Sequence, residues 1–192
     1  GIGIPETVIA VLNEEGQDHL FTPIIESGAI GGIALGDMNF GSCICPDAII
    51  DQPYMFDFID GGGLDMSFLG LAQCDPKGNI NVSRFGTKVA GCGGFIDISQ
   101  NVKNMVFCGT FTAKGLKTHV EDGKLVIDQE GEDKKFKNTL QQITFSGTVA
   151  AQNNKNILFV TERAVLKLTR EGLVVTEIAP GIDLERDVLG QM

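Results

Sequence analysis

The sequence has few of the groups that bind nucleic acids or metals. It carries 15 Lys and Arg against 25 Asp and Glu, a net charge of −10, and only two histidines. Nucleic-acid surfaces need clustered basic residues that release counterions from phosphates, so this balance argues against such a partner. The pair Cys43 and Cys45 could bind a metal, but neither His19 nor His119 stands at zinc-ligand spacing. We expect no metal site.

Long apolar runs are also missing. No run approaches the roughly 20 residues that a membrane-spanning helix needs, and there is no apolar region typical of a secretory signal. The five cysteines are an odd number without regular spacing, which reduced thiols explain most simply. These absences predict a cytoplasmic protein that does not contact a membrane.

Two motifs of common enzyme classes are absent. The glycine-rich segment 91–94 has neither the GxGxxG spacing of dinucleotide sites nor the GK[ST] ending of a P-loop, so by itself it predicts a tight turn with close helix–strand packing. There is no G-x-S-x-G segment, and neither histidine has a recognisable partner. A serine hydrolase is therefore the least expected enzyme class.

The composition is that of an ordinary globular domain. Apolar residues make up 43% and charged residues 21% of 192 positions, enough for one domain with a sound core. The sequence has 25 glycines, and ten of them lie in clusters at 28–36, 61–63 and 91–94. Clusters at these places favour loops built around a ligand over a low-complexity linker, and no linker divides residues 1–192.

The periodicity of apolar residues predicts alternating helices and strands. A tight turn at Gly1 and Gly3 leads to a helix beginning at Pro5 and ending near Gly16. The other expected elements are helices at 53–60 and after Asp183, strands at 20–25, 64–71, 80–85, 105–111, 157–161, 164–169 and 173–178, and a hairpin turning at 122–123. Lys134, Lys135 and Lys137 are expected on a solvated surface.

Glu26 is the candidate for chemistry. It stands where the apolar segment 20–25 stops, and Ser27 and several glycines follow it. A charged side chain at the end of an apolar strand is an expected catalytic position in an open α/β sheet, and glycines allow a bulky ligand to approach the backbone. A solvated glutamate before a flexible loop explains the same local pattern, and that pattern alone favours the simpler explanation.

The segment ESGAIGG at 26–32 resembles the active-site segment of the glutamate-dependent (family I) CoA-transferases, nearest to the single-chain acetate/propionate type. The segments at 1–8, 91–99 and 161–189 also resemble that family. The resemblance implies an α/β fold, an open three-layer α/β/α CoA-transferase-like domain with added β-hairpins. It also implies that residues 1–192 are the C-terminal, β-subunit-like half of a longer chain with two homologous halves.

The resemblance implies roles for particular residues. Glu26 corresponds to the catalytic nucleophile, and the backbone N–H of Gly94 to a donor of the oxyanion hole. Ser27, Gly28, Gly93 and Asp65 correspond to positions near the substrate or CoA. Ser27 could equally contact a substrate carboxylate or satisfy the turn, and the ketoacid-specific relatives carry Asn at the positions of Ser27 and Asp65.

The implied function is transfer of CoA between a short-chain acyl-CoA and a carboxylic acid, through an acyl-glutamyl anhydride and a glutamyl-CoA thioester. No cofactor is implied, since CoA is a substrate. The implied partners are the acyl-CoA, a short-chain carboxylate, the N-terminal half with much of the CoA site, and further copies in a homo-oligomer. The half alone is expected to be nearly inactive. Alternatives are an acyl-CoA hydrolase on the same scaffold and a non-catalytic sugar-phosphate sensor.

Overall fold

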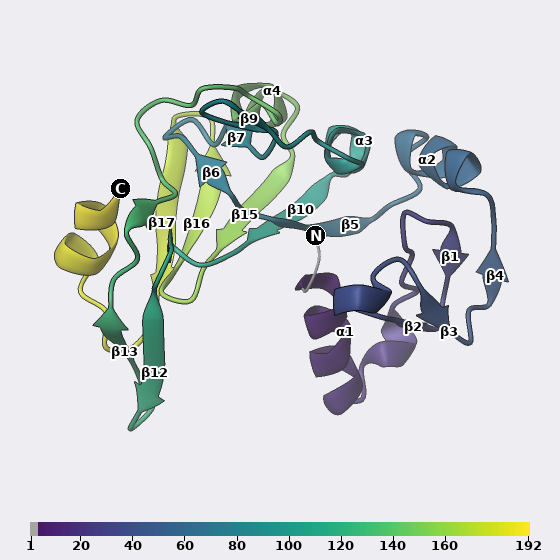
Figure 1. The fold of residues 1–192 in the computed structure, drawn as a ribbon, viewed down its shortest axis with the longest axis horizontal. Coiled ribbons are helices and arrows are strands. Elements are labelled where there is room, and N and C mark those ends of the chain that lie inside the picture. Colours follow the sequence, from purple (N-terminus) through teal and green to yellow (C-terminus); the bar gives the residue numbers. More distant parts are fainter. Residues whose placement is uncertain (1–3) are drawn as a thin grey trace.

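The computed structural model describes residues 4–192, which are built around a five-stranded mixed sheet (Figure 1). The strand order is β17-β16-β15-β10-β5, in which β15, β10 and β5 are parallel neighbours and β16 runs antiparallel to both β15 and β17. Their bounds are β5 Met66–Gly70, β10 Asn104–Cys108, β15 Asn156–Val160, β16 Ala164–Thr169 and β17 Gly172–Ile178.

Alternating side chains give the sheet one fully buried face. On β10 and β15, Phe107 and Phe159 are buried and paired in register, while their neighbours Val106 and Leu158 point to the opposite face and are half-buried. Successive residues of a strand point to opposite faces, so this pattern places the core on one side. The three strands 157–161, 164–169 and 173–178 expected from the sequence are confirmed as β15, β16 and β17.

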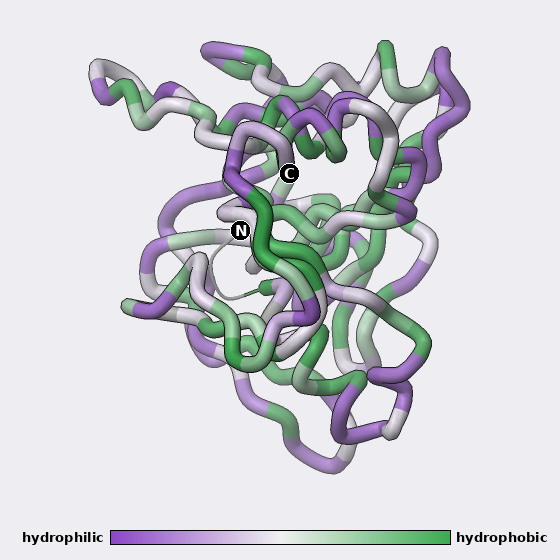
Figure 2. The backbone as a smooth tube through the Cα atoms, turned by 90° about the vertical axis from the view of Figure 1, so that its right-hand side faces the viewer, coloured by the Kyte–Doolittle hydropathy of each residue, from purple (hydrophilic) through white to green (hydrophobic). Residues whose placement is uncertain are grey.

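Three helices cover the buried face: α2 (Gln52–Asp60), α3 (Phe95–Asn101) and α4 (Gly147–Gln152). Phe107 lies at the centre of this core, with its ring centroid 5.8 Å from that of Phe95 on α3 and 5.1 Å from that of Phe145. Figure 2 shows apolar stretches running through the body of the chain, with most projecting turns hydrophilic. Hydrophobic burial on one face of the sheet therefore holds the fold together.

The expected added hairpins are present. The longest joins β12 (Lys117–Glu121) to β13 (Lys124–Gln129) through Asp122 and Gly123, both with positive φ, as a two-residue hairpin turn requires. The other strands are two residues long and pair antiparallel: β1 Ala29–Ile30 with β4 Ala48–Ile49, β2 Ile33–Ala34 with β3 Cys43–Ile44, β6 Gln73–Cys74 with β7 Ile80–Asn81, β8 Arg84–Phe85 with β9 Lys88–Val89, and β11 Thr112–Ala113 with β14 Asp133–Lys134.

The N-terminal part differs from the sequence expectation. Helix α1 (Ile4–Glu14) is confirmed, with Gly16 at φ +68° after it. The strand expected at 20–25 is wrong: Asp18–Leu20 is a 3-10 helix, and Ile24 alone forms an isolated bridge. Leu20 and Phe21 are exposed because no strand of the sheet runs beside them, and apolar composition alone does not make a strand. The expected turn at Gly1 and Gly3 lies outside the described residues.

Local hydrogen bonds determine the structure of two further segments. The strand expected at 80–85 is split into β7 and β8, because Asn81 accepts from the N–H of Ser83 and donates to the carbonyl of Arg84. At the C-terminus, Asp183 accepts from the N–H of Arg186 and caps a helix, as expected. That helix, Leu184–Val188, has π geometry and leads into the 3-10 turn Leu189–Gln191; a further 3-10 turn is Asp37–Asn39.

Within residues 4–192, no helix is both long and apolar enough to cross a membrane. The same residues contain no group of three or more His, Cys, Asp or Glu placed to hold a metal ion.

Candidate functional site

Glu26 lies in a tight turn rather than at the end of a sheet strand. The turn joins Ile24 to β1 and is closed by hydrogen bonds from the N–H of Ile25 to the carbonyl of Ala29 and from the N–H of Gly28 to the carbonyl of Ile25, both 2.9 Å. Ile24 and Ile30, on its two sides, pair with each other and pack against the core. The residues flanking Glu26 are therefore anchored even though the strand before it does not form.

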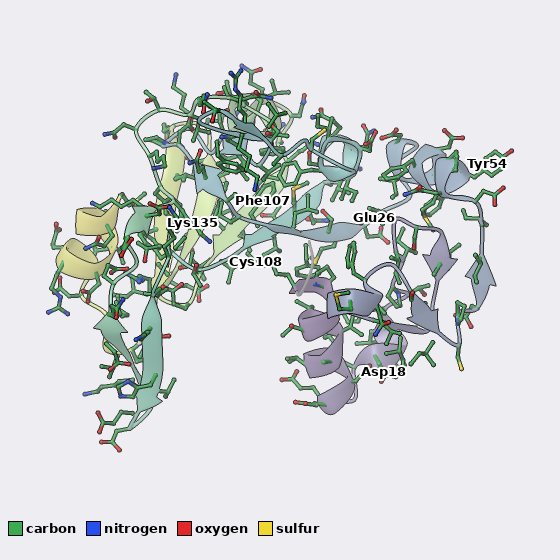
Figure 3. The ribbon with its side chains drawn as sticks, viewed as in Figure 1. Asp18, Glu26, Tyr54, Phe107, Cys108 and Lys135 are labelled. Carbon is green, nitrogen blue, oxygen red and sulfur yellow. The ribbon has the colours of Figure 1, made fainter. Side chains whose placement is uncertain are left out.

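The carboxylate of Glu26 has no hydrogen-bond or ion-pair partner in the described part of the chain. Its side chain is half-buried, and in the view of Figure 3 it lies between β1 and β5. A half-buried carboxylate with no internal partner contributes little to folding and is available to another molecule. This is the property that a nucleophilic carboxylate needs.

The glycines after Glu26 allow another segment of the same chain, residues 47–50, to approach the backbone closely. A Cβ on Gly28 would overlap the carbonyl oxygen of Ile50, and one on Gly31 would overlap the carboxylate of Asp47; both glycines also have positive φ. Hydrogen bonds from the N–H of Ile50 to the carbonyl of Gly28 and from the N–H of Asp47 to the carbonyl of Ile30 hold the two segments together. The close approach expected for a ligand is therefore made here by residues 47–50.

The hydroxyl of Ser27 donates a 2.6 Å hydrogen bond to the carbonyl of Gly41. It thereby ties the Glu26 turn to the loop at 37–42. This hydrogen bond reaches a backbone carbonyl 14 residues away, so it does not satisfy the turn of Ser27 itself.

Gly93 and Gly94 directly precede α3. Gly93 is exposed with φ +52°, and a Cβ on Gly94 would lie 2.9 Å from the ring of Phe56 on α2. Among the described residues, no acceptor takes a hydrogen bond from the N–H of Gly94. A backbone N–H left free at a fixed place is what an oxyanion donor requires.

The two candidate segments contact the same short stretch of chain. The Glu26 turn packs on Ile50 through Gly28, and Gly94 packs on Phe56, six residues further along, in the middle of α2. Asp65 lies elsewhere, exposed just before β5, where its backbone carbonyl accepts from the side chain of Asn104. Residues 50–56 therefore link Glu26 to Gly94, and Asp65 stands apart from that link.

A buried charge network was not expected from the sequence. Arg163 is fully buried and donates to Glu130 at 2.7 and 3.0 Å and to Glu162 at 2.7 Å, and its guanidinium lies 5.1 Å from the ring centroid of Phe111. Glu162 also accepts from the N–H of Phe111. The sequence shows only a turn at 162–163, because Glu130 and Phe111 lie far from Arg163 in the chain. The network fixes loops at the carboxyl ends of the strands.

Lys135 departs from the solvated surface expected for it. Its ammonium is half-buried and donates to the carbonyl of Leu71 at 3.2 Å. Burial lowers the pKa of this amine, although the nearby carboxylate of Glu162 opposes the change. Lys134 remains exposed and donates to the carbonyl of Gly190.

Comparison with known proteins gives close relatives. No family model matches the chain. Caffeate CoA-transferase of Acetobacterium woodii is 48% identical over 197 residues, covering 100% of this chain and 37% of that protein. Acetate CoA-transferase YdiF of Escherichia coli K12 is 46% identical over 192 residues, covering 100% and 36%. The chain thus spans little more than a third of the length of these relatives.

Solved structures of known proteins also match this chain. The YdiF apoenzyme of E. coli O157:H7 superposes with a TM-score of 0.93 at 46% identity, covering all of this chain and 36% of that one. A second YdiF structure, described as a thioester complex with CoA, has a TM-score of 0.93 at 45% identity. Glutaconate CoA-transferase of Acidaminococcus fermentans (TM-score 0.57, 20% identity) and the decarboxylase AibA/AibB (0.63, 17%) share the fold alone. The expected fold is confirmed.

Proposed function

We propose that this chain, homologous over its whole length to family I CoA-transferases, carries the nucleophilic glutamate of such an enzyme. The reaction moves CoA between a short-chain acyl-CoA and a carboxylic acid. The observation that carries the proposal is the side chain of Glu26, which is half-buried in an anchored turn and has no partner within the described chain. Relatives that span the whole chain are named caffeate and acetate CoA-transferases.

Glu26 attacks the carbonyl carbon of the acyl-CoA, and the CoA thiolate leaves, which gives an acyl-glutamyl anhydride. The thiolate then attacks the glutamyl carbonyl, releasing the first carboxylate and leaving a glutamyl-CoA thioester. An acceptor carboxylate attacks this thioester and expels the CoA thiolate, which gives a second anhydride. The thiolate then attacks the acyl carbonyl of that anhydride, which releases the new acyl-CoA and regenerates the carboxylate of Glu26. The energy of the thioester is kept throughout, so the reaction needs no ATP, metal or cofactor.

Each tetrahedral intermediate develops an oxyanion, and Gly94 is our candidate donor. One oxyanion-hole donor typically lowers the barrier by about 3–4 kcal/mol. The contact between Gly94 and the ring of Phe56 supports the proposal, because it holds Gly94 against helix α2, which begins two residues after Ile50, the residue on which Gly28 packs. Gly93 and Gly28 shape the backbone near these groups, Ser27 orders the adjoining loop, and Asp65 is retained as a candidate substrate contact.

The rest of the proposed enzyme lies outside these residues. Since the chain matches little more than a third of its relatives, we assign residues 1–192 to the C-terminal half and most CoA contacts to the N-terminal half. The net charge of −10 supports this division, because the phosphates of CoA require cationic groups. A homo-oligomer in the cytoplasm is part of the same proposal.

The test joins the chain to its missing part as a chimera, in which it replaces the matched region of E. coli YdiF. The chimera is incubated with acetyl-CoA, and mass spectrometry looks for CoA attached to the peptide containing Glu26. Glu26→Gln should abolish both the adduct and transfer, while Glu15→Gln, on an exposed residue outside the site, should leave them unchanged. Transfer at an undiminished rate in Glu26→Gln would overturn the proposal.

The same experiment separates transfer from hydrolysis. A transferase releases free acid from acetyl-CoA mainly when an acceptor acid such as propionate is present. Equal release with and without the acceptor would instead identify an acyl-CoA hydrolase that uses the same glutamate.

A further inference from the structure

The glycine segment 91–94 ends at the proposed oxyanion donor Gly94 and contains little that could fix its own conformation. Gly91 and Gly93 are exposed and have positive φ, and a Cβ on either would meet open space. Glycine restricts the backbone less than any other residue. An oxyanion donor must nevertheless be held within about 0.5 Å of its productive position. The segment therefore has to be fixed from both of its ends.

The downstream end is fixed by helix α3. The carbonyl of Gly94 accepts a hydrogen bond from the N–H of Ile98 at 3.0 Å, and the carbonyl of Cys92 accepts from the N–H of Phe95 at 3.1 Å. Phe95 and Ile98 are both buried, so they attach this helix to the hydrophobic core. The end of the glycine segment thus follows the position of α3.

The upstream end is fixed by the backbone of Ser83. The carbonyl of Ser83 accepts two hydrogen bonds, from the N–H of Ala90 at 2.9 Å and from the N–H of Gly91 at 3.2 Å. These bonds extend the β8–β9 hairpin, and none of the residues 84–89 that form this hairpin is buried. Hydrophobic packing does not hold the hairpin in place, so the position of Ser83 determines where the glycine segment begins.

The side chain of Ser83 is held by a segment far away in the sequence. Its hydroxyl is hydrogen-bonded at 2.8 Å to the hydroxyl of Thr144, 61 residues later in the chain. The hydroxyl of Thr144 also accepts from the N–H of Val82 at 3.2 Å, and the side chain of Gln142 donates to the hydroxyl of Ser83 at 3.0 Å. Ser83 and Thr144 are buried, with exposed fractions of 5% and 8%. Their hydroxyls therefore bond to each other and to the protein rather than to solvent.

Two further contacts join residues 141–144 to β7 and to the hairpin. The N–H of Thr144 donates to the carbonyl of Ile80 at 2.7 Å. The side-chain amide of Gln141 bonds to both the N–H and the carbonyl of Gly86, in the hairpin turn, at 2.7 and 2.9 Å. In the view of Figure 1, β7 and β9 lie above the sheet beside α4, and the chain then runs on to α3. Residues 141–144 thus hold the hairpin at its base and at its turn.

We propose that Ser83 and Thr144 are positioning residues for CoA transfer. Their hydroxyl pair fixes the start of the glycine segment and, through it, the direction of the Gly94 N–H. This inference rests on the proposed function, in which Gly94 is the oxyanion donor. Because the oxyanion exists only in the transition state and the tetrahedral intermediate, loss of the pair should lower kcat and leave KM unchanged. A role confined to stability would change neither constant in the folded protein.

Thr144→Val in the YdiF chimera removes the hydroxyl and keeps the shape of the side chain. We expect kcat for transfer from acetyl-CoA to propionate to fall about tenfold or more, with KM for acetyl-CoA within about twofold of the parent, because a small misplacement of an aligned group is costly. Thr144→Ser keeps a hydroxyl and should retain most of kcat. An undiminished kcat in Thr144→Val that is folded by circular dichroism would overturn the proposal.

Thr169→Val is the matched control. The hydroxyl of Thr169 also bonds to backbone on two sides, donating to the carbonyl of Gly172 at 2.9 Å and accepting from the N–H of Glu171 at 3.2 Å, but it lies in the turn between β16 and β17. This variant should lose some stability and keep the kcat of the parent. A fall in kcat equal to that of Thr144→Val would show that any lost hydroxyl has this effect, and would overturn the proposal.

Hydrogen–deuterium exchange of the chimera tests the positioning without measuring activity. Thr144→Val should speed exchange in the peptide that contains the Ala90 and Gly91 amides about fivefold or more, and Thr169→Val should not. Ser83→Ala is the second variant if Thr144→Val does not fold, and it should change exchange and kcat in the same direction. In the double variant the two losses should not add, since the hydroxyls act as one pair.

The outcomes separate this proposal from the proposed function. Unchanged exchange in Ser83→Ala and Thr144→Val would overturn the positioning role. Faster exchange with an undiminished kcat would also overturn it, because the segment would then be held without serving the reaction. Transfer at an undiminished rate in Glu26→Gln would instead overturn the proposed function, and the exchange rates would still report whether the hydroxyl pair fixes the glycine segment.

Discussion

Arg163, whose side chain has no exposed surface, donates hydrogen bonds to both carboxylate oxygens of Glu130, which lies 33 residues earlier in the chain. Its third carboxylate contact is to Glu162 beside it in the chain. A buried ion network of this kind carries a large desolvation cost, so it is strongly sensitive to the loss of one member.

Arg163→Met should therefore lower the free energy of unfolding by about 3–5 kcal/mol, because Glu130 and Glu162 would lose their counter-charge. Urea titration followed by circular dichroism measures the change. Arg186→Met is the control: the side chain of Arg186 is 74% exposed in its pair with Asp187, so its loss should cost much less than the loss of Arg163. The triple variant Arg163→Met/Glu130→Gln/Glu162→Gln should regain most of the loss; if it does not, packing rather than charge explains the effect.

Stability should fall in acid through Glu130. Burial raises the pKa of Glu130, but hydrogen bonds from Arg163 and Thr112 outweigh it and leave the pKa below its ordinary value. A carboxyl whose pKa is depressed by folding contributes stability above its unfolded pKa, near ~4.3, and loses it as pH falls through the folded pKa. Unfolding free energies at pH 7, 4.5 and 3.5 should decline, and Glu130→Gln should decline less. Identical pH slopes for the two proteins would contradict this assignment.

Gly28→Ala should disrupt the turn that carries Glu26. The added Cβ would overlap the carbonyl oxygen of Ile50, and φ is +120°, so both backbone and packing oppose the change. We expect a loss of more than about 2 kcal/mol, compared with about 1 kcal/mol for Gly86→Ala, where φ is also positive but the space is open. Thermal unfolding of the two variants checks the difference; equal losses would mean that conformation alone, not contact with Ile50, requires glycine.

Ser27→Ala tests whether the hydroxyl acts only on the loop. Removing its bond to the carbonyl of Gly41 should cost about 0.5–1.5 kcal/mol. In the chimera, a purely local role predicts kcat and KM for the acceptor acid within about threefold of the parent. A tenfold or larger rise in KM with unchanged kcat would instead show that Ser27 contacts the substrate carboxylate.

Much of the fold could be predicted from local pattern. Alternating apolar residues at 157–178 gave three strands in the right order, and Asp122-Gly123 gave the hairpin turn, because periodicity and turn chemistry are local properties. The segment 20–25 failed for the opposite reason. Its apolar residues match a buried strand, but a strand needs a neighbour, and only Ile24 finds one.

The site could be predicted only in part. The resemblance singled out Glu26 and Gly94, and the structure attaches both to residues 50–56. The contact between Gly28 and Ile50 was beyond the sequence, because the glycine cluster is equally consistent with a ligand loop. The ion pairs of Arg163 were not predicted for a related reason. Glu130 lies far from Glu162 and Arg163 in the chain, and no periodic signal connects it to them.

The stretch from Ile50 to Phe56 belongs to neither candidate segment, yet it touches both. Each residue added to an α-helix lengthens the helix by about 1.5 Å and rotates the following residues about its axis by ~100°. Inserting a single alanine after Gln52 would consequently swing the Phe56 ring away from Gly94 while leaving every residue of the ESGAIGG segment in place. The spacing between Glu26 and Gly94 thus depends on the number of residues between Ile50 and Phe56.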